Sequence, residues 1–573
     1  MSIGRVFIHQ HTLDQPFVAE GQFWLPETPE QRVAGTLNYS PGSITVNLIG
    51  DPGAIGSQTL LRDDGGVREL VLGSTRVGPC ALWSAFSASS STTYGVGGTI
   101  GVATYRANRL CVGEAYESVD EIEFKDFVIS FDVLPTWLGH NPFGPTEPDS
   151  DALHRYVPFT PVAAVIPEED LQIELSTRLV DRGGGYQGFT WVHEVWFAIR
   201  SPEPKDIEWH LEKMGRVQAF LSTLVEDAAI PTSIVGSLDP LTLTYVILPL
   251  TRAPAAEAVS EIQILLPYGE IGDRFTDSLC RWIREWKHIG TAATLLYGTL
   301  LVELPPEFEL LALTQALETF HRHVYDGTYL GREEYEKVQA ALAGALPSGT
   351  PSDLRQALTR RIEYGHEYSQ RKRFHELLAS LDDTARDLVR TDRALLNRVV
   401  DERNHLTHRP PESNDYVPMD NAERRLTAQK LKAFLFLLLL SHLHFTGEDV
   451  KGATPCPGGV GQPGQEHIHL RRNRASVNDR RLTSASEPFR SQNTQRCEMP
   501  FLGAKGSASA FPATLRNSEG ADGVVPPSSL VCPLSARSDG VPRPPLYASQ
   551  RFWAQLQRLS DLRSPRAQSP SWP

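Results

Sequence analysis

Residues 395–411 read LLNRVVDERNHLTHRPP, and this stretch decides how the C-terminal half of the chain is interpreted. Apolar side chains recur in it at the i, i+3 and i+4 spacing of a helix that buries one face, at Leu395, Leu396, Val399 and Val400. The helical conformation is disfavoured for a residue that precedes a proline, so the helix should end near Arg409, just before Pro410. We therefore predict a helix over residues 392–407.

Two polar side chains occupy the next turn of this apolar face. Continuing the stripe leads to Arg403 and Asn404, and burying a guanidinium and an amide costs free energy unless they are paired or functional. His408 lies one turn beyond Asn404, near the helix C-terminus, where the macrodipole favours an imidazolium. An arginine can stabilise charge on a phosphate, a histidine can move a proton near neutral pH, and Asn404 can orient either. The three side chains suit phosphodiester cleavage; the alternative is a structural arginine and histidine at an ordinary helix end.

Helical periodicity extends on both sides of this segment, from about residue 276 onward. We predict helices over residues 277–286, 306–325, 332–345, 352–364, 369–380, 385–390, 392–407 and 421–443. Such a region has ~170 residues, which is enough to bury a core of its own. The sequence thus predicts an all-α bundle over residues 271–450.

Residues 1–270 show the shorter period of β-strands. We predict strands over residues 36–39, 44–49, 69–72, 127–133, 171–175, 193–199, 243–248 and 261–266. In the second of these, Ile44, Val46 and Leu48 alternate with polar residues, as in a half-buried strand. One helix is predicted among the strands, over residues 206–225. The predicted fold class is α+β, with a sandwich-like β-rich domain followed by a helical bundle.

The net charge of −14 is a sum over two different kinds of sequence. Residues 453–573 hold 14 Arg and one Lys against 8 acidic residues, a net +7, so the preceding residues carry −21. An acidic body argues against non-specific coating of long nucleic acid. The tail is rich in Ser, Arg, Pro and Gly and shows no sustained period, which predicts disorder over residues 451–573. It is either a native disordered tail or a non-native extension from a shifted reading frame.

Membrane, metal and cofactor signals are absent from the sequence. The dense apolar run over residues 433–440 is too short to span a bilayer, and residues 1–15 lack the pattern of a signal peptide. The six cysteines are widely spaced and include no CxxC pair. His-x-His pairs such as His321 and His323 lack further ligands at metal-site spacing. We expect a cytoplasmic protein that has no membrane partner, no bound metal and no cofactor.

Four segments, taken in order, resemble one protein family. The R-N-x-x-x-H pattern of residues 403–408, near the end of a helical domain, resembles the signature of the HEPN superfamily, and specifically its Apea-like branch in bacterial abortive-infection proteins. LTQALETFHR at residues 313–322 resembles the ALExxHR helix of that branch, and residues 361–364 with 371–378 resemble its middle helices. GQFWLP at residues 21–26, with the later Gly35 and Gly50, resembles the opening of the associated N-terminal domain. The resemblance covers most of residues 15–445.

The resemblance implies a metal-independent endoribonuclease that acts in anti-phage defence. In such families the RNA 2′-hydroxyl attacks the adjacent phosphate and leaves a 2′,3′-cyclic phosphate, and two HEPN domains usually pair. By this analogy Arg403, Asn404 and His408 are catalytic, the helical domain forms a homodimer, and RNA is the substrate. The β-rich domain would sense or restrain, with a phage-derived trigger as its possible partner.

Two further groups of residues are candidates for supporting roles. Glu318 and Arg322 lie one turn apart on the 306–325 helix and would supply contacts behind the catalytic residues; the alternative is an ordinary i, i+4 ion pair. Arg371, Lys372 and Arg373 would contact RNA; the alternative is a solvated helix face. A rival function for the whole chain is a non-catalytic interaction protein, with a helical dimerisation module and a ligand-binding β-rich domain.

Overall fold

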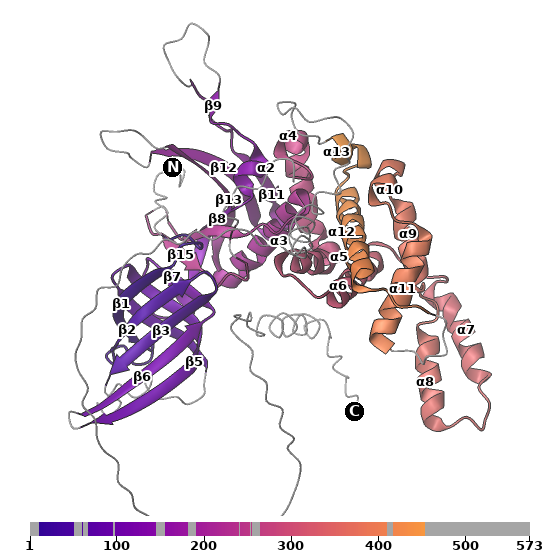
Figure 1. Ribbon diagram of the computed structural model, residues 1–573, viewed down its shortest axis with the longest axis horizontal. Coiled ribbons are helices and arrows are strands. Elements are labelled where there is room, and N and C mark those ends of the chain that lie inside the picture. Colours follow the sequence, from indigo (N-terminus) through magenta and orange to yellow (C-terminus); the bar gives the residue numbers. More distant parts are fainter. Residues whose placement is uncertain are drawn as a thin grey trace, which may run out of the picture. The chain divides into compact units, whose positions relative to one another are not determined.

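The computed structural model describes residues 11–50, 60, 67–95, 98–144, 155–181, 191–239, 241–252, 254, 264–408 and 416–452. Its strands precede most of its helices along the chain (Figure 1), which confirms the predicted fold class of a β-rich region followed by a helical one. From residue 453 onward, the predicted disordered tail lies outside the described residues. The predicted division of the chain at residues 270 and 271 stays a prediction.

Six antiparallel strands pair in a closed ring, in the order β5-β4-β1-β2-β3-β6 and back to β5. They are β1 (Phe17–Trp24), β2 (Val33–Ser40), β3 (Ser43–Gly50), β4 (Val67–Thr75), β5 (Gly78–Gly95) and β6 (Gly98–Ala107). Ile44, Val46 and Leu48 of β3 are buried, as their alternation with polar residues predicts. Ser40 pairs with Ser43, so Pro41 and Gly42 form the tight connection between β2 and β3.

A second row of strands continues from one end of β5. Its order is β7-β15-β14-β8-β13-β12-β11, all antiparallel. The strands are β7 (Arg109–Val112), β8 (Glu123–Phe131), β11 (Val162–Ile166), β12 (Leu171–Asp181), β13 (Trp191–Asp206), β14 (Pro231–Ser237) and β15 (Thr244–Ile247). A separate hairpin pairs β9 (Phe143–Gly144) with β10 (Arg155–Tyr156).

Helix α3 (Ile207–Val225) covers strands β8 and β13 and is the helix predicted within the β-rich region. The side chain of Asp206 opens it by accepting a hydrogen bond of 2.7 Å from the Trp209 N–H. Its His210 is buried against the ring of Phe127 and lies 2.8 Å from the carbonyl oxygen of Phe124. Short helix α2 (Leu134–Leu138) follows β8 and ends at Gly139, whose φ of 63° suits glycine.

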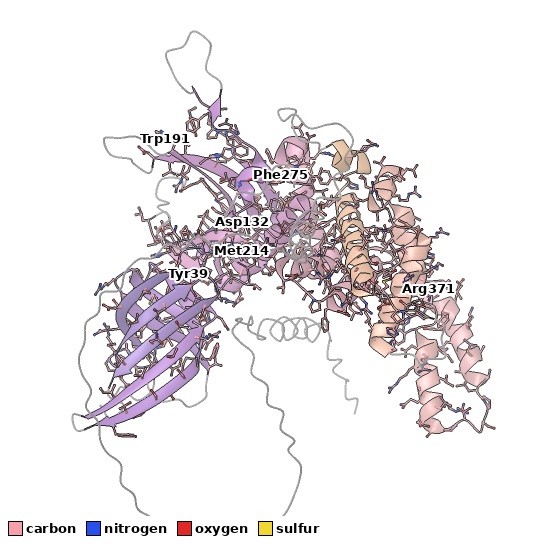
Figure 2. All side chains as sticks on the ribbon, viewed as in Figure 1. Tyr39, Asp132, Trp191, Met214, Phe275 and Arg371 are labelled. Carbon is pink, nitrogen blue, oxygen red and sulfur yellow. The ribbon has the colours of Figure 1, made fainter. Side chains whose placement is uncertain are left out.

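Helix α5 (Phe275–Leu301) packs against both kinds of structure. Near its start, Phe275 (labelled in Figure 2) contacts the rings of Phe197 and Phe220, and Trp282 contacts Phe220. The Trp282 indole N–H donates to the Arg216 carbonyl oxygen at 2.9 Å, which ties α5 to α3. The first turns of α5 thus complete the core of the β-rich region. The same helix also packs on α6 and α12, which follow it in the chain.

The helical region follows the predicted elements closely. Its elements are α4 (Tyr268–Ile271), α6 (Pro306–Val324), α7 (Arg332–Gly344), α8 (Ser352–Glu363), α9 (Gln370–Ser380), α10 (Asp383–Val389), α11 (Arg393–His408), α12 (Asn421–His442) and α13 (Gly447–Gly452). Helices α6 and α12 form much of the bundle with α5. In Figure 1 the pair α7 and α8 lies at the edge of the helical region.

Two element predictions are wrong. Residues 264–266, the described part of the predicted 261–266 strand, are not a strand, because Leu266 instead bonds through its backbone N–H to the Leu224 carbonyl oxygen. The predicted 277–286 helix continues to Leu301, since buried Ile289, Leu296 and Leu300 extend its apolar face. None of the described helices is long and apolar enough to cross a membrane.

Candidate functional site

Helix α11 carries Arg403, Asn404 and His408, the three predicted catalytic residues. The Asp392 carboxylate accepts a 2.7 Å hydrogen bond from the Leu395 N–H and so opens the helix. Leu396, Val399 and Val400 are buried, whereas Leu395 is half-buried. The predicted apolar stripe therefore holds α11 in the bundle, mainly against α6 and α9.

The polar position that the stripe buries is Glu402, which the sequence interpretation passed over. Its side chain is 0% exposed. One carboxylate oxygen accepts hydrogen bonds from the Tyr416 hydroxyl and, at 2.9 Å, from the Met419 N–H, and the other accepts from Arg424 Nε at 2.9 Å. Burial favours the protonated form, yet these donors outweigh it and hold the pKa of Glu402 below its ordinary value. In the sequence, the only sign of this buried carboxylate was a possible basic partner, Arg424, near the start of the next predicted helix.

Arg403 and Asn404 were expected to continue the buried stripe, but both are only half-buried. Arg403 Nη1 donates a 3.1 Å hydrogen bond to Asn404 Oδ1, so the amide orients the guanidinium. The buried face of α11 continues through Glu402, because buried donors stabilise its carboxylate. Arg403 and Asn404, the next two residues, therefore lie at the margin of the bundle. A half-buried guanidinium retains donors for an anion.

His408 is the last residue of α11, and its side chain is exposed. The Thr407 hydroxyl donates at 2.8 Å to the Arg403 carbonyl oxygen in this last turn. Residues 409–415, which include the predicted helix stop at Arg409 and Pro410, lie outside the described residues. The carboxylate of Glu402 fixes Tyr416 and Met419, so the chain returns to α11 directly after this gap. His405, in the same turns, lies with its ring centroid 5.8 Å from that of Tyr416.

The basic run at the start of α9 is divided between three environments. Arg371, labelled in Figure 2, is exposed. Its ion pair with Asp401 joins α9 to α11, the helix that carries Arg403. Lys372 Nζ lies 4.0 Å from the ring centroid of Tyr329 and 3.4 Å from that of Tyr368. Arg373 is 1% exposed, so it cannot reach RNA at the surface as the sequence predicted. A solvated helix face does not describe it either.

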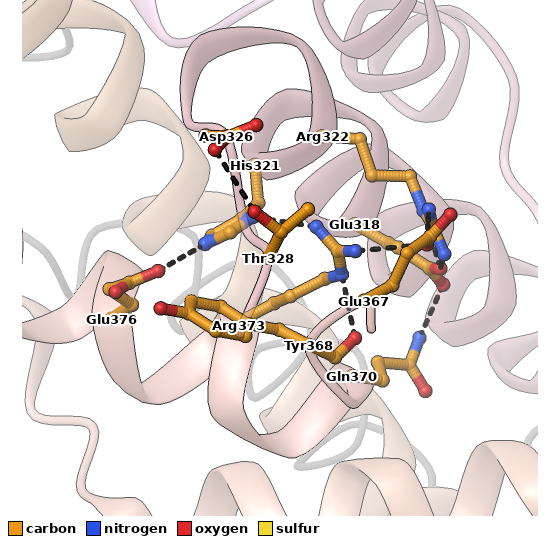
Figure 3. Close-up of polar contacts among 10 residues, drawn as sticks. All are labelled: Glu318, His321, Arg322, Asp326, Thr328, Glu367, Tyr368, Gln370, Arg373 and Glu376. Atoms are coloured by element: carbon orange, nitrogen blue, oxygen red, sulfur yellow. Dashed lines mark hydrogen bonds and ion pairs between the residues drawn. The ribbon is translucent and has the colours of Figure 1, made fainter. Parts of the chain in front are cut away.

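Arg373 instead lies at the centre of a buried polar network between α6 and α9 (Figure 3). Its guanidinium donates to His321 Nδ1 at 3.1 Å, to Glu367 Oε2 at 3.1 Å and to the Tyr368 carbonyl oxygen at 3.0 Å. Because Arg373 only donates, His321 Nδ1 is an acceptor, and its Nε2–H donates to Glu376 at 2.7 Å. Burial lowers the pKa of His321, and the charge of Arg373 acts in the same direction.

Glu318 and Arg322 form an i, i+4 ion pair, the alternative to a role behind the catalytic residues, with 3.0 Å between Nη2 and Oε1. Arg322 also pairs with Glu367, and Glu318 accepts from Gln370 Nε2 at 2.9 Å. These bonds attach α6 to the segment that precedes α9. Within the described part of the chain, no hydrogen bond or ion pair joins Glu318 or Arg322 to Arg403 or His408. The structure therefore places them in the network around Arg373.

The described residues offer an oriented cation and an exposed imidazole on one helix end, with a second cation on the neighbouring helix. Arg403 can bind an anion, and His408 can exchange a proton with it. Arg371, held by Asp401, lies on the element that packs beside them. Among the described residues, no group of three or more His, Cys, Asp or Glu side chains is placed to hold a metal ion.

Comparison with protein families gives two matches in this chain. Residues 19–282 match the model described as ApeA N-terminal domain 1, and residues 311–449 match the model described as Apea-like HEPN. The second match begins inside α6 and contains the Arg373 network and the whole of α11. Both matches confirm the family predicted from the four sequence segments. No curated protein and no solved structure matches the chain.

Proposed function

We propose that this chain, in which an ApeA N-terminal domain 1 precedes an Apea-like HEPN domain, is an RNA-cleaving effector of anti-phage defence. HEPN domains are generally associated with RNase activity. The observation that carries the proposal is the Arg403–Asn404 hydrogen bond, which orients a half-buried guanidinium within two turns of the exposed His408. These are the types of side chain that phosphodiester cleavage requires.

In the proposed reaction the RNA supplies its own nucleophile. The 2′-oxygen forms a bond to the adjacent phosphorus while the bond from phosphorus to the 5′-oxygen breaks. The 2′-hydroxyl loses a proton and the departing 5′-oxygen gains one, so the products are a 2′,3′-cyclic phosphate and a 5′-hydroxyl. Arg403 stabilises the charge that builds on the phosphate oxygens, and His408 moves a proton. Asn404 holds the Arg403 guanidinium through the 3.1 Å hydrogen bond. No step is assigned to a metal ion.

The proposed active unit is a homodimer formed through the helical region. The reaction takes one proton from the 2′-hydroxyl and delivers one to the 5′-oxygen, and two histidines perform both transfers without waiting for one to be recharged. A second copy of α11 would supply the second His408 and a second Arg403. Two guanidinium groups would also neutralise more of the charge on the phosphate.

The β-rich region is proposed to sense an infection cue and to restrain the nuclease. What supports a coupling is its attachment to α5: Glu168, just after β11, pairs with Arg284 of α5. In the same place the Cys280 thiol lies 3.7 Å from the Val165 carbonyl oxygen. A displacement of β11 would therefore move α5, the helix that packs directly on α6.

The test is cleavage of total cellular RNA by the purified full chain in EDTA, with analysis of the product ends. We expect cleavage that gives cyclic-phosphate ends and is lost in Arg403→Ala and in His408→Ala. Matched controls on the same helix are Arg398→Ala, which breaks an ion pair with Glu423, and His405→Ala; both should cleave RNA like the parent.

Three outcomes would count against the proposal. Cleavage that persists in both Arg403→Ala and His408→Ala means that the site is elsewhere. Cleavage that requires a divalent metal and stops in EDTA means a different chemistry. No cleavage under any condition, together with phage protection that survives both substitutions, favours the non-catalytic interaction protein.

A further inference from the structure

Two tyrosine rings and a lysine lie together at the start of α9, beside α11. The ring centroids of Tyr329 and Tyr368 are 4.7 Å apart, with the ring planes at 70°. Lys372 Nζ lies over both rings, at 4.0 Å and 3.4 Å from their centroids. Tyr329 is 54% exposed, so a large aromatic surface stays in contact with solvent. We call Tyr329, Tyr368 and Lys372 the tyrosine–lysine cluster.

The backbone holds this cluster in a fixed position. Tyr329 N–H donates to the His366 carbonyl oxygen at 2.7 Å, and Tyr368 N–H donates to the Gly327 carbonyl oxygen at 2.8 Å. These two bonds pair the segment after α6 with the segment before α9. Tyr368 also gives its carbonyl oxygen to the buried Arg373. An exposed ring that is held in place loses little conformational freedom when a flat ligand stacks on it.

Charge near the cluster favours an anionic ligand. Lys372 has its ammonium group over the rings and no carboxylate partner within the described part of the chain. The neighbouring carboxylate of Glu367 already accepts from both Arg322 and Arg373. Arg371, the residue before Lys372 in α9, is paired with Asp401 of α11, which places the cluster next to the helix that carries Arg403.

We propose that the tyrosine–lysine cluster binds an unpaired strand of the RNA substrate, with a base stacked on Tyr329 and a phosphate held by Lys372. The inference rests on the proposed function for the identity of the substrate. Aromatic side chains stack on bases whose faces are free, and those faces are covered in a duplex. A lysine beside such a ring neutralises the backbone phosphate. The cluster therefore selects single-stranded RNA and delivers it to α11.

The experiment measures binding apart from cleavage. The full chain carrying His408→Ala is titrated with a fluorescein-labelled, unstructured RNA of about 12 nucleotides, within the length such surfaces cover, and binding is followed by anisotropy. The same strand annealed to its complement is the second probe. We expect tighter binding of the single strand. Adding Tyr329→Ala should weaken single-strand binding about tenfold, and Tyr329→Phe, which keeps the ring face, should leave it unchanged.

Matched variants separate stacking and charge from general damage. Tyr156→Ala removes a tyrosine of similar exposure, 51%, from the β9–β10 hairpin and should not alter binding. Lys372→Gln should lower the slope of log Kd against log salt by about 0.7, the value for one phosphate contact on a single strand. Lys287→Gln, at an exposed position of α5, should leave that slope unchanged.

The inference is overturned if Tyr329→Ala binds the single strand like its parent, or if Tyr329→Phe loses as much affinity as Tyr329→Ala. It is also overturned if the duplex binds as tightly as the single strand. Cleavage by the chain with intact His408 reports on the proposed function separately. Binding that depends on Tyr329 without any cleavage would reject the RNase proposal alone, and cleavage that is insensitive to Tyr329 would reject the cluster alone.

Discussion

Glu402 and Arg424 form a buried ion pair, with 2.9 Å between Oε1 of the glutamate and Nε of the arginine. The pair joins α11 to α12 directly behind the Arg403–Asn404 pair, and it spans the gap at residues 409–415. The buried carboxylate also receives the Met419 N–H and the Tyr416 hydroxyl. One side chain thus sets where the chain re-enters the bundle after His408.

Replacing this carboxylate should destabilise the protein. Glu402→Ala leaves the Met419 N–H without its partner and removes one of the two acidic partners of Arg424. We expect a loss of about 3 kcal/mol in the free energy of unfolding, the low end for a broken buried pair, because Arg424 keeps Glu307. Urea denaturation of the full chain measures it. Glu423→Ala breaks the exposed pair with Arg398 and should cost less than about 1 kcal/mol. Equal losses in the two variants would refute the special role of Glu402.

A glycine beside the Arg373 network should resist substitution. Gly327 has a φ of 64°, and an added Cβ would lie 2.4 Å from Arg373 Nη1. Gly327→Ala should therefore cost about 2 kcal/mol or more, from the left-handed backbone and from displacement of a buried guanidinium. Thermal unfolding followed by circular dichroism measures the change. Gly331→Ala is the matched control, since an added Cβ there meets no atom within 4 Å and should shift the melting temperature little.

The amide of Asn404 should contribute to cleavage through the guanidinium that it orients. Asn404→Ala removes the acceptor at 3.1 Å from Arg403 Nη1, so we expect kcat to fall about tenfold, the cost of a lost charge-assisted hydrogen bond. The melting temperature should not change, because the side chain is only half-buried. Asn404→Asp restores an acceptor but adds a negative charge beside the phosphate, and it should be at least as slow. Full activity in Asn404→Ala would show that the hydrogen bond has no role in the reaction.

His210 should make stability depend on pH in the β-rich region. Burial lowers its pKa to about 4, against the opposing effect of its hydrogen bond with Phe124. The unfolded state, with a pKa near 6.5, therefore takes up the proton first as the pH falls. Stability should be complete above about pH 6.5 and decline by up to about 3 kcal/mol toward pH 4. Denaturation at a series of pH values measures this slope. His210→Gln should flatten it, whereas His288→Gln should retain it.

Local signals made the helical region predictable. Six of the predicted helix starts fall within one residue of the observed ones, because prolines and capping side chains such as Asp420 and Ser369 mark them in the sequence. The closed ring was beyond such reasoning. The pairing of β3 with β6 joins residues 44–50 to 101–107, and no local period specifies which strands meet.

The candidate site likewise combines features that local sequence predicts with features that depend on tertiary contacts. Helical spacing found Arg403, Asn404 and His408 as a group, but it placed Arg403 and Asn404 in the core instead of Glu402. Spacing alone cannot show that donors from residues 416, 419 and 424 converge on one carboxylate. Arg373 was misplaced for a similar reason. Its partners His321 and Glu367 come from other segments of the chain. Only the tertiary structure brings them to the guanidinium, and their hydrogen bonds offset the cost of burying its charge.

The aromatic contacts of α5 determine where the β-rich region can be joined to the helical region of a related protein. Phe275 and Trp282 pack on rings of the β-rich region, and the first family match ends at residue 282, inside this helix. A chimera joined at residue 271 would give a foreign β-rich region two large rings shaped for other neighbours. A graft that respects the packing must move the whole helix with its β-rich region and place its junction at residues 302–305. An exchanged β-rich region would therefore bring with it α5, a helix on which α6 of the helical region also packs.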